Sequence, residues 1–213
     1  MNTIILVSTT HKEKGLANLD NLYSVLQHIN PEIVFAELPY DEYSDYFTSF
    51  TKRTLESNTI NAFHKNKQIE IIPVDMSSPD ITILNEINYL FDAIHNNSKS
   101  IDSILEHIDL YTRQYGFPYI NSEKHYEHIT SQKEEELKTI QNMNNEKLTA
   151  LYEKWIDLNS LREDEMLSNI QNYFIKNPFR FSVLLIGAAH SQSIINKSQA
   201  IVMNPCIEQF AVK

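Results

Sequence analysis

Two histidines and two acidic residues stand at the ends of four apolar runs in this sequence. TIILVSTTH closes on His11, EIVFAE on Glu37, IEIIPVD on Asp75 and FSVLLIGAAH on His190. Imidazole and carboxylate groups bind divalent transition metals such as Zn, Mn, Co or Fe, and they also serve as general acids and bases. If the runs are neighbouring strands of a parallel sheet, their carboxyl ends share the edge where such sheets bind ligands. We therefore predict a polar site at that edge.

Each of these residues also has a purely structural interpretation. A histidine after a strand is often a loop residue, and Asp75 precedes SSPD, where it could close a turn or cap a helix. Glu37 follows the apolar residues Val34, Phe35 and Ala36, and a carboxylate shielded in this way needs a cation or several donors. The prediction rests on the coincidence of all four positions.

A fifth candidate residue, Arg162, lies in a long segment with a helical pattern, LYEKWIDLNSLREDEMLSNIQNYF. Arg162 lies in its apolar stripe, so we expect either an anion nearby, such as a sheet-end carboxylate or a substrate oxyanion, or a side chain that reaches water at the rim. Glu165 is a candidate local partner, and we expect Glu163 to point away from the stripe. The stripe consists of Trp155, Leu158, Met166 and Tyr173.

His125 and His128 have a spacing that can hold zinc on one face of a helix. They stand among charged residues, and such a pattern is more typical of a helix face that is exposed to solvent.

The four apolar runs, at 3–8, 32–37, 69–75 and 181–187, lack alternation and are typical of parallel strands covered on both faces. The segment 15–29 predicts an amphipathic helix between the first two strands, and a weaker helix is expected over 43–65. After the fourth strand we expect a short helix over 191–198 and further strands at 200–204 and 206–212.

The segment 80–177 is long, polar and helical in pattern. The fold predicted for residues 1–213 is therefore a single α/β domain, with a mostly parallel central sheet flanked by helices and a large helical insertion at 80–177 before the late strands. The insertion could close over the site or merely cover one face of the sheet. Four aromatic residues after Glu37 either line a substrate groove or, as we favour, pack the helical insertion down: Tyr40, Tyr43, Tyr46 and Phe47.

The composition of the chain narrows the range of possible functions. A net charge of −10 without a Lys/Arg cluster argues against nucleic acid or a membrane surface as a partner. The single cysteine excludes an internal disulfide, and the three scattered glycines exclude the glycine-rich phosphate loops of nucleotide-binding proteins. No apolar run is long enough for a signal peptide core or a membrane span, and we expect a cytoplasmic protein.

Four motifs resemble, in their order, those of the TraB/PrgY, Tiki and erythromycin-esterase-like superfamily. They are STTH (8–11), INPEIVFAELP (29–39), LREDEM (161–166) and LLIGAAH (184–190). They correspond to a first G-x-x-H after a strand, a glutamate in a phrase like "kPdvVavEL", a helical arginine followed by a methionine, and a second G-x-x-H. Ser8 replaces the first glycine, and Leu161 stands where many members carry a glutamate, whose role would then fall to Glu163 or Glu165.

The resemblance implies hydrolysis of a peptide bond, as in the metal-dependent Tiki branch, or of a lactone ester, as in the macrolide esterases. The TraB/PrgY branch implies peptide-pheromone shut-down. The expected function is thus a metal-dependent hydrolase of a peptide or small-molecule ester.

In this hypothesis His11, Glu37 and His190 bind a divalent metal, with Asp75 as a further carboxylate. Arg162 stabilises the oxyanion, and Glu37 is the base if only the histidines bind the ion. One alternative is a non-catalytic protein that binds a peptide or a metal ligand. Another is a metal-free esterase in which His11 is the base.

Overall fold

The structure, a computed structural model, describes residues 3–201, 203 and 205–211, and within them five strands form one parallel sheet. The spatial order is β3-β2-β4-β1-β5. The α/β class and the parallel sheet predicted from the sequence are confirmed. The strands are β1 (Thr3–Thr9), β2 (Ile33–Pro39), β3 (Glu70–Asp75), β4 (Phe181–Gly187) and β5 (Cys206–Gln209).

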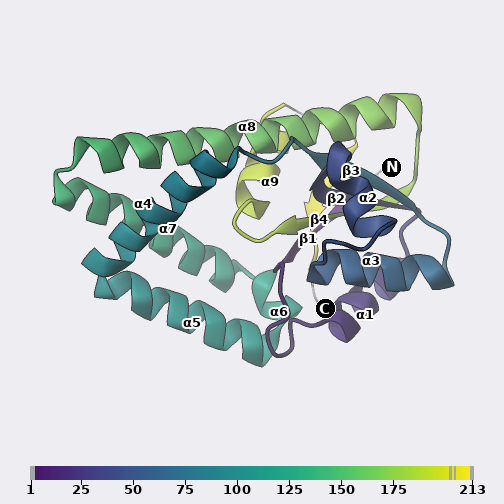
Figure 1. Cartoon of the computed structure of the whole chain (residues 1–213). Helices are drawn as coiled ribbons and strands as arrows, with labels where there is room; N and C mark the ends of the chain where they lie inside the picture. Colours follow the sequence, from purple (N-terminus) through teal and green to yellow (C-terminus); the bar gives the residue numbers. More distant parts are fainter. Residues whose placement is uncertain (1–2, 202, 204, 212–213) are drawn as a thin grey trace.

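Helices connect the strands and cover both faces of the sheet (Figure 1). They are α1 (Leu19–Ile29), α2 (Tyr43–Phe47), α3 (Leu55–Asn66), α4 (Ile81–Asn97), α5 (Lys99–Tyr115), α6 (Phe117–Ile120), α7 (Glu123–Met143), α8 (Glu146–Lys176) and α9 (Ser191–Ala200), with a short 3₁₀ turn at Tyr40–Glu42.

The connections reverse direction between β1 and β4. From β1 the chain moves to β2 and β3 through α1 and α3, which pack on one face of the sheet. From β4 it moves the opposite way to β5 through α9, which packs on the other face together with α8. Right-handed crossovers require this exchange of faces. The crevice beyond the ends of β1 and β4 is therefore the position where such sheets bind ligands.

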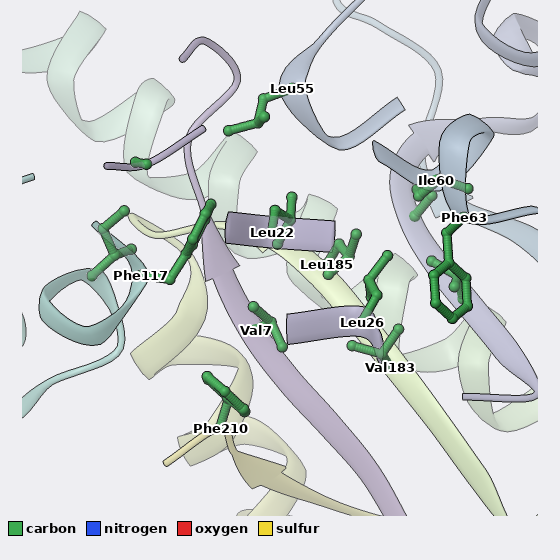
Figure 2. Close-up of a cluster of buried hydrophobic side chains, with 14 of the residues drawn as sticks. Val7, Leu22, Leu26, Leu55, Ile60, Phe63, Phe117, Val183, Leu185 and Phe210 are labelled. Carbon is green, nitrogen blue, oxygen red and sulfur yellow. The ribbon is translucent and has the colours of Figure 1, made fainter. Parts of the chain in front are cut away.

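The face covered by α1 and α3 shows why these segments are helical. Leu22 and Leu26 of α1, four residues apart, lie on Val7 of β1 and on Val183 and Leu185 of β4, as Figure 2 shows. The five side chains are at most 1% exposed. The strand sequences are continuous apolar runs because the opposite face of the sheet is buried as well. It is covered by Met166, Leu167 and Ile170 of α8.

The helices α4 to α8 lie between β3 and β4 in the chain, as the predicted insertion requires. In Figure 1, α4, α5 and α7 lie to one side of the sheet, and α8 runs from them across it. These helices have a buried cluster of their own, which is separate from the two sheet faces. It consists of Leu90, Ile94, Ile101, Ile140, Leu148 and Tyr152.

Two predicted elements differ from the structure. The expected helix over 43–65 is two helices, because Thr54 starts a new one: its side chain accepts from the backbone of Ser57, whose hydroxyl accepts from Thr54 in return. The strand expected at 200–204 is wrong in its first part, since Ala200 ends α9 and Ile201 is a turn residue. Residues 202 and 204 lie outside the described residues.

Candidate functional site

The ends of β1 and β4 bring the two predicted histidines to one edge of the sheet. The strands are hydrogen-bonded neighbours, and Thr9 of β1 pairs with Gly187 of β4. His11 follows Thr9 by two residues, and His190 follows Gly187 by three. Both imidazoles therefore belong to the crevice where the chain connections reverse.

Glu37 of β2 lies next to Gly187 and is nearly buried, with 7% of its side chain exposed. Its Oε2 accepts a hydrogen bond from the backbone N–H of Gly187 at 2.5 Å. A Cβ atom at position 187 would lie 3.2 Å from this oxygen and 3.5 Å from Nε2 of His11. A glycine suits the end of this strand because the carboxylate of Glu37 approaches its backbone closely.

Arg162 of α8 joins three of the predicted site residues. Its Nη2 donates to Oε1 of Glu37 at 2.9 Å and to Oδ2 of Asp75 at 2.6 Å, and Nη1 lies 3.4 Å from Nε2 of His190. Burial alone would lower the pKa of the guanidinium, but Asp75 and Glu37 raise the pKa above its ordinary value. Of the two interpretations, the one with an anion nearby is confirmed, and the anions are sheet-end carboxylates.

Glu163 does not point away from the site, so this expectation was wrong. Its side chain is 6% exposed and accepts from Nδ1 of His190 at 2.9 Å, from the Ser193 hydroxyl and from Nζ of Lys197. Burial tends to raise the pKa of this carboxyl, but these donors lower it below its ordinary value. The one-stripe interpretation failed because α8 packs against both the sheet and α9, which buries two neighbouring faces of the helix.

Glu165 is not the partner of Arg162 either. It is exposed, and its Oε1 accepts instead from the Asn169 amide four residues later. Asp75 does not cap a helix; α4 is capped by Asp80. Besides binding Arg162, Asp75, the last residue of β3, accepts a hydrogen bond from the backbone N–H of Met76.

His11 has a carboxylate partner that the sequence did not reveal. Its Nδ1 lies 3.1 Å from Oε1 of Glu56, in the first turn of α3. This hydrogen bond raises the pKa of His11 to about 9; burial lowers the pKa and Glu37 adds to the rise. The pattern T-L-E-S does predict a helix start at Thr54, but only the tertiary structure brings that turn to His11. The second Glu56 oxygen is buried and has no hydrogen-bond partner among the described residues.

Arg162 and His190, which contact each other, line two different cavities. The first, of about 350 Å³, is lined by His11, Glu37 and Arg162, together with Glu42, Glu56 and Asp75. The second, of about 330 Å³, is lined by His190 and Glu163 on the side of the helical insertion. Of the four aromatic residues, Tyr43, Tyr46 and Phe47 pack against the core on the α1 and α3 face, and Tyr46 and Phe47 also line the first cavity, whereas Tyr40 is 85% exposed.

The predicted metal ligands fit an ion only in part. Each imidazole is held by a carboxylate at Nδ1 and keeps Nε2 toward the crevice, the arrangement common in metal-binding histidines. Glu37 and Asp75, however, already accept from Arg162. Among the described residues, no group of three or more His, Cys, Asp or Glu side chains is arranged to hold a metal ion. Divalent metal binding stays a prediction.

His125 and His128 do not form the solvated face expected of them. His125 is 3% exposed and packs edge-on against Tyr119, whose hydroxyl lies 2.8 Å from Nδ1 of His128. Burial lowers the pKa of His125 to about 4. These histidines belong to the packing of α7 against α6.

No protein-family model, no curated protein and no solved structure matches this chain. The superfamily resemblance therefore rests on the four motifs alone. Within the part of the chain that the structure describes, no helix has the length and apolar character needed to cross a membrane.

Proposed function

We propose that this protein hydrolyses an ester or amide bond, with water activated beside Arg162 at the ends of β1 and β4. The observation that carries the proposal is the position of this guanidinium. It contacts Glu37, Asp75 and His190 at the switch point of the sheet, which is where ligands bind in such folds. A pair of a histidine and a carboxylate lies on each side of it.

His190 is the general base in this proposal. Glu163 can only accept, so Nδ1 of His190 carries the proton of their hydrogen bond. A guanidinium can only donate, so Nε2, which faces Arg162, carries a lone pair. This tautomer removes a proton from a water molecule at the crevice, and the water oxygen attacks the carbonyl carbon of the substrate. Glu163 holds the ring and stabilises the imidazolium that forms.

Arg162 stabilises the oxyanion that the attack produces. It stays charged beside its two carboxylates, and Nη1 has a second N–H besides the one directed at His190. Removal of one such donor typically lowers the rate about 10²- to 10³-fold.

His11 supplies the proton for the leaving group. With a pKa of about 9 the imidazole is protonated at neutral pH, which favours a role as an acid over the role as a base considered from the sequence. As the tetrahedral intermediate collapses, the carbon–oxygen or carbon–nitrogen bond breaks and the leaving alcohol or amine takes this proton. The acid formed from the acyl group and the alcohol or amine are the two products.

A metal-dependent hydrolase, as the motifs imply, is the second candidate. It is favoured by the anchoring of both imidazoles at Nδ1, which leaves Nε2 of His11 and His190 to hold a divalent ion. Such an ion would lower the pKa of a bound water toward neutrality. Glu163 then takes the place of the glutamate that is missing at Leu161.

The test is a panel of p-nitrophenyl esters and short peptides, applied to the wild type and to Arg162→Gln, His190→Gln and Leu161→Ala. The last is the matched control, because Leu161 adjoins Arg162 in sequence and is 61% exposed. We expect turnover to fall about 10²-fold or more in the first two variants and to stay unchanged in the control.

Elemental analysis and chelator treatment separate the two candidates. Activity that survives chelation in a metal-poor protein supports the mechanism through His190 and Arg162 alone, whereas loss on chelation with recovery on Zn, Mn, Co or Fe supports the metal enzyme. Peptide binding without any product, in metal-replete buffer, contradicts both and supports the non-catalytic alternative.

A further inference from the structure

The second cavity, beside His190, has an apolar wall that the proposed chemistry does not use. Phe91 of α4, Ile129 of α7, and Trp155 and Ile156 of α8 line it, and its volume is about 330 Å³. Phe91 and Trp155 meet edge to face, with ring centroids 5.7 Å apart at 87°. This edge-to-face arrangement is one that aromatic pairs prefer.

One residue of the cavity lining, Asn159, has a side-chain oxygen without a hydrogen-bond partner among the described residues. Oδ1 of Asn159 is buried and accepts no hydrogen bond from any described residue. The other polar side chains of the lining are already paired: Gln132 with Glu136, Lys133 with the carbonyl of Ala189, Glu163 with His190 and Ser193, and Ser160 with Lys197. A buried acceptor without a donor is unfavourable, and such sites in native proteins call for an explanation.

The volume of the cavity, its apolar wall and the unpaired oxygen of Asn159 indicate what kind of ligand would fit there. Binding sites for small molecules begin at about 300 Å³ and combine apolar walls with a few polar groups that fix orientation. This cavity lies at the lower end of that range, so it suits one ring-sized group. The oxygen of Asn159 selects a group that donates a hydrogen bond.

We propose that the cavity binds an aromatic side chain carrying one hydrogen-bond donor, a phenol or an indole, of the molecule that is hydrolysed beside His190. The inference rests on the proposed function, because it assigns this group to the substrate. It names a class of substrate: an ester or amide of a tyrosine-like or tryptophan-like residue.

Binding is tested without turnover, because Trp155 is the only tryptophan of the chain and lines the cavity. The probes are N-acetyl-tyrosine amide and its O-methyl ether, which has the ring but lacks the donor. We expect the phenol to change the tryptophan emission and to bind about tenfold more tightly than the ether.

Asn159→Leu removes the acceptor and should abolish the difference between the probes, while Leu161→Ala, on the exposed side of α8, should preserve it. Equal affinities in the wild type, discrimination that survives Asn159→Leu, or emission that is unchanged at saturating phenol would each overturn the inference.

Failure of the proposed function would give different results from failure of the aromatic site. Selective binding of the phenol with no hydrolysis of any ester or amide would refute the reaction and leave the aromatic site in place. Hydrolysis that shows no preference for aromatic substrates, with no emission change, would refute the site and leave the reaction in place.

Discussion

His11 and His190 are the same residue type after two neighbouring strands, yet their surroundings give them different roles. His11 has a side chain that is 60% exposed, and Glu56 holds it in the protonated form at neutral pH. His190 is nearly buried between Glu163 and Arg162, with a lone pair directed at a cation. One site thus contains a proton donor and a proton acceptor, which is the combination that hydrolysis needs.

The pKa of His11 is the first prediction at the scale of residues. In a histidine titration by NMR, His11 should titrate with a pKa of about 9 in the wild type. Glu56→Gln removes the main cause of the rise, so the pKa should fall toward the ordinary value of 6.5. Glu42→Gln is the control, because Glu42 lines the same cavity but pairs with Lys52. A pKa near 9 in Glu56→Gln would contradict the assignment.

Gly187→Ala is the second prediction at this scale. The added methyl group would lie 3.2 Å from Oε2 of Glu37, so the carboxylate would have to shift and weaken its hydrogen bond to the backbone. We expect the free energy of unfolding to fall by about 1–3 kcal/mol in urea titrations, with a loss of hydrolysis. Glu37→Asp, which shortens the side chain, should recover part of the stability in the double variant. An unchanged urea midpoint in Gly187→Ala would show that the space at position 187 is not needed.

At the scale of elements, two helices deliver side chains that the strands lack. The first turn of α3 carries Glu56 to His11, and the backbone N–H of Leu55 also donates to the carbonyl of His11 at 3.0 Å. The middle of α8 carries Arg162 and Glu163 to opposite sides of the crevice. The start of α3 is therefore part of the site.

Thr54→Ala tests this role of α3. Loss of the reciprocal cap should lower the free energy of unfolding by about 1 kcal/mol. It should also lower the pKa of His11, because Glu56 in the frayed turn is held less firmly. Asn145→Ala removes the cap of α8 at its far end and is the matched control. It should cost similar stability and leave the pKa of His11 unchanged; a fall of the pKa in both variants would argue against a local effect.

The strands and the parallel sheet could be predicted from the sequence because strands buried on both faces read as unbroken apolar runs. Glu37, Asp75 and His190 followed from the rule that polar side chains at carboxyl strand ends converge. Glu56 and Glu163 could not be assigned in this way. Their roles depend on where α3 and α9 pack. The periodicity of apolar residues indicates one buried face of a helix, but it does not show that a polar residue on a neighbouring face is buried as well.

At the scale of the whole molecule, the raised pKa of His11 makes stability depend on pH. A histidine with a higher pKa in the folded state stabilises the protein while it is protonated, below its unfolded value of 6.5. This contribution is lost as the pH rises from 6.5 through about 9. Solvent screening makes it small, since the side chain is exposed.

We expect the difference in unfolding free energy between the wild type and His11→Gln to shrink over this interval. Urea titrations of both proteins at a series of pH values measure it. A difference that grows with rising pH would mean that the imidazole is buried in its neutral form.

The position of β4 has a consequence for biosynthesis. This strand lies between β1 and β2, although some 140 residues separate it from β2 along the chain. Before β4 is made, β2 can pair only with β3 and β1 has neither of its partners, so a nascent chain keeps the apolar strand β1 unpaired until the intervening helices have been translated. Stalling before residue 181 should leave a species prone to aggregation and in need of a chaperone, and synonymous codons that slow translation there should lower the yield of native protein.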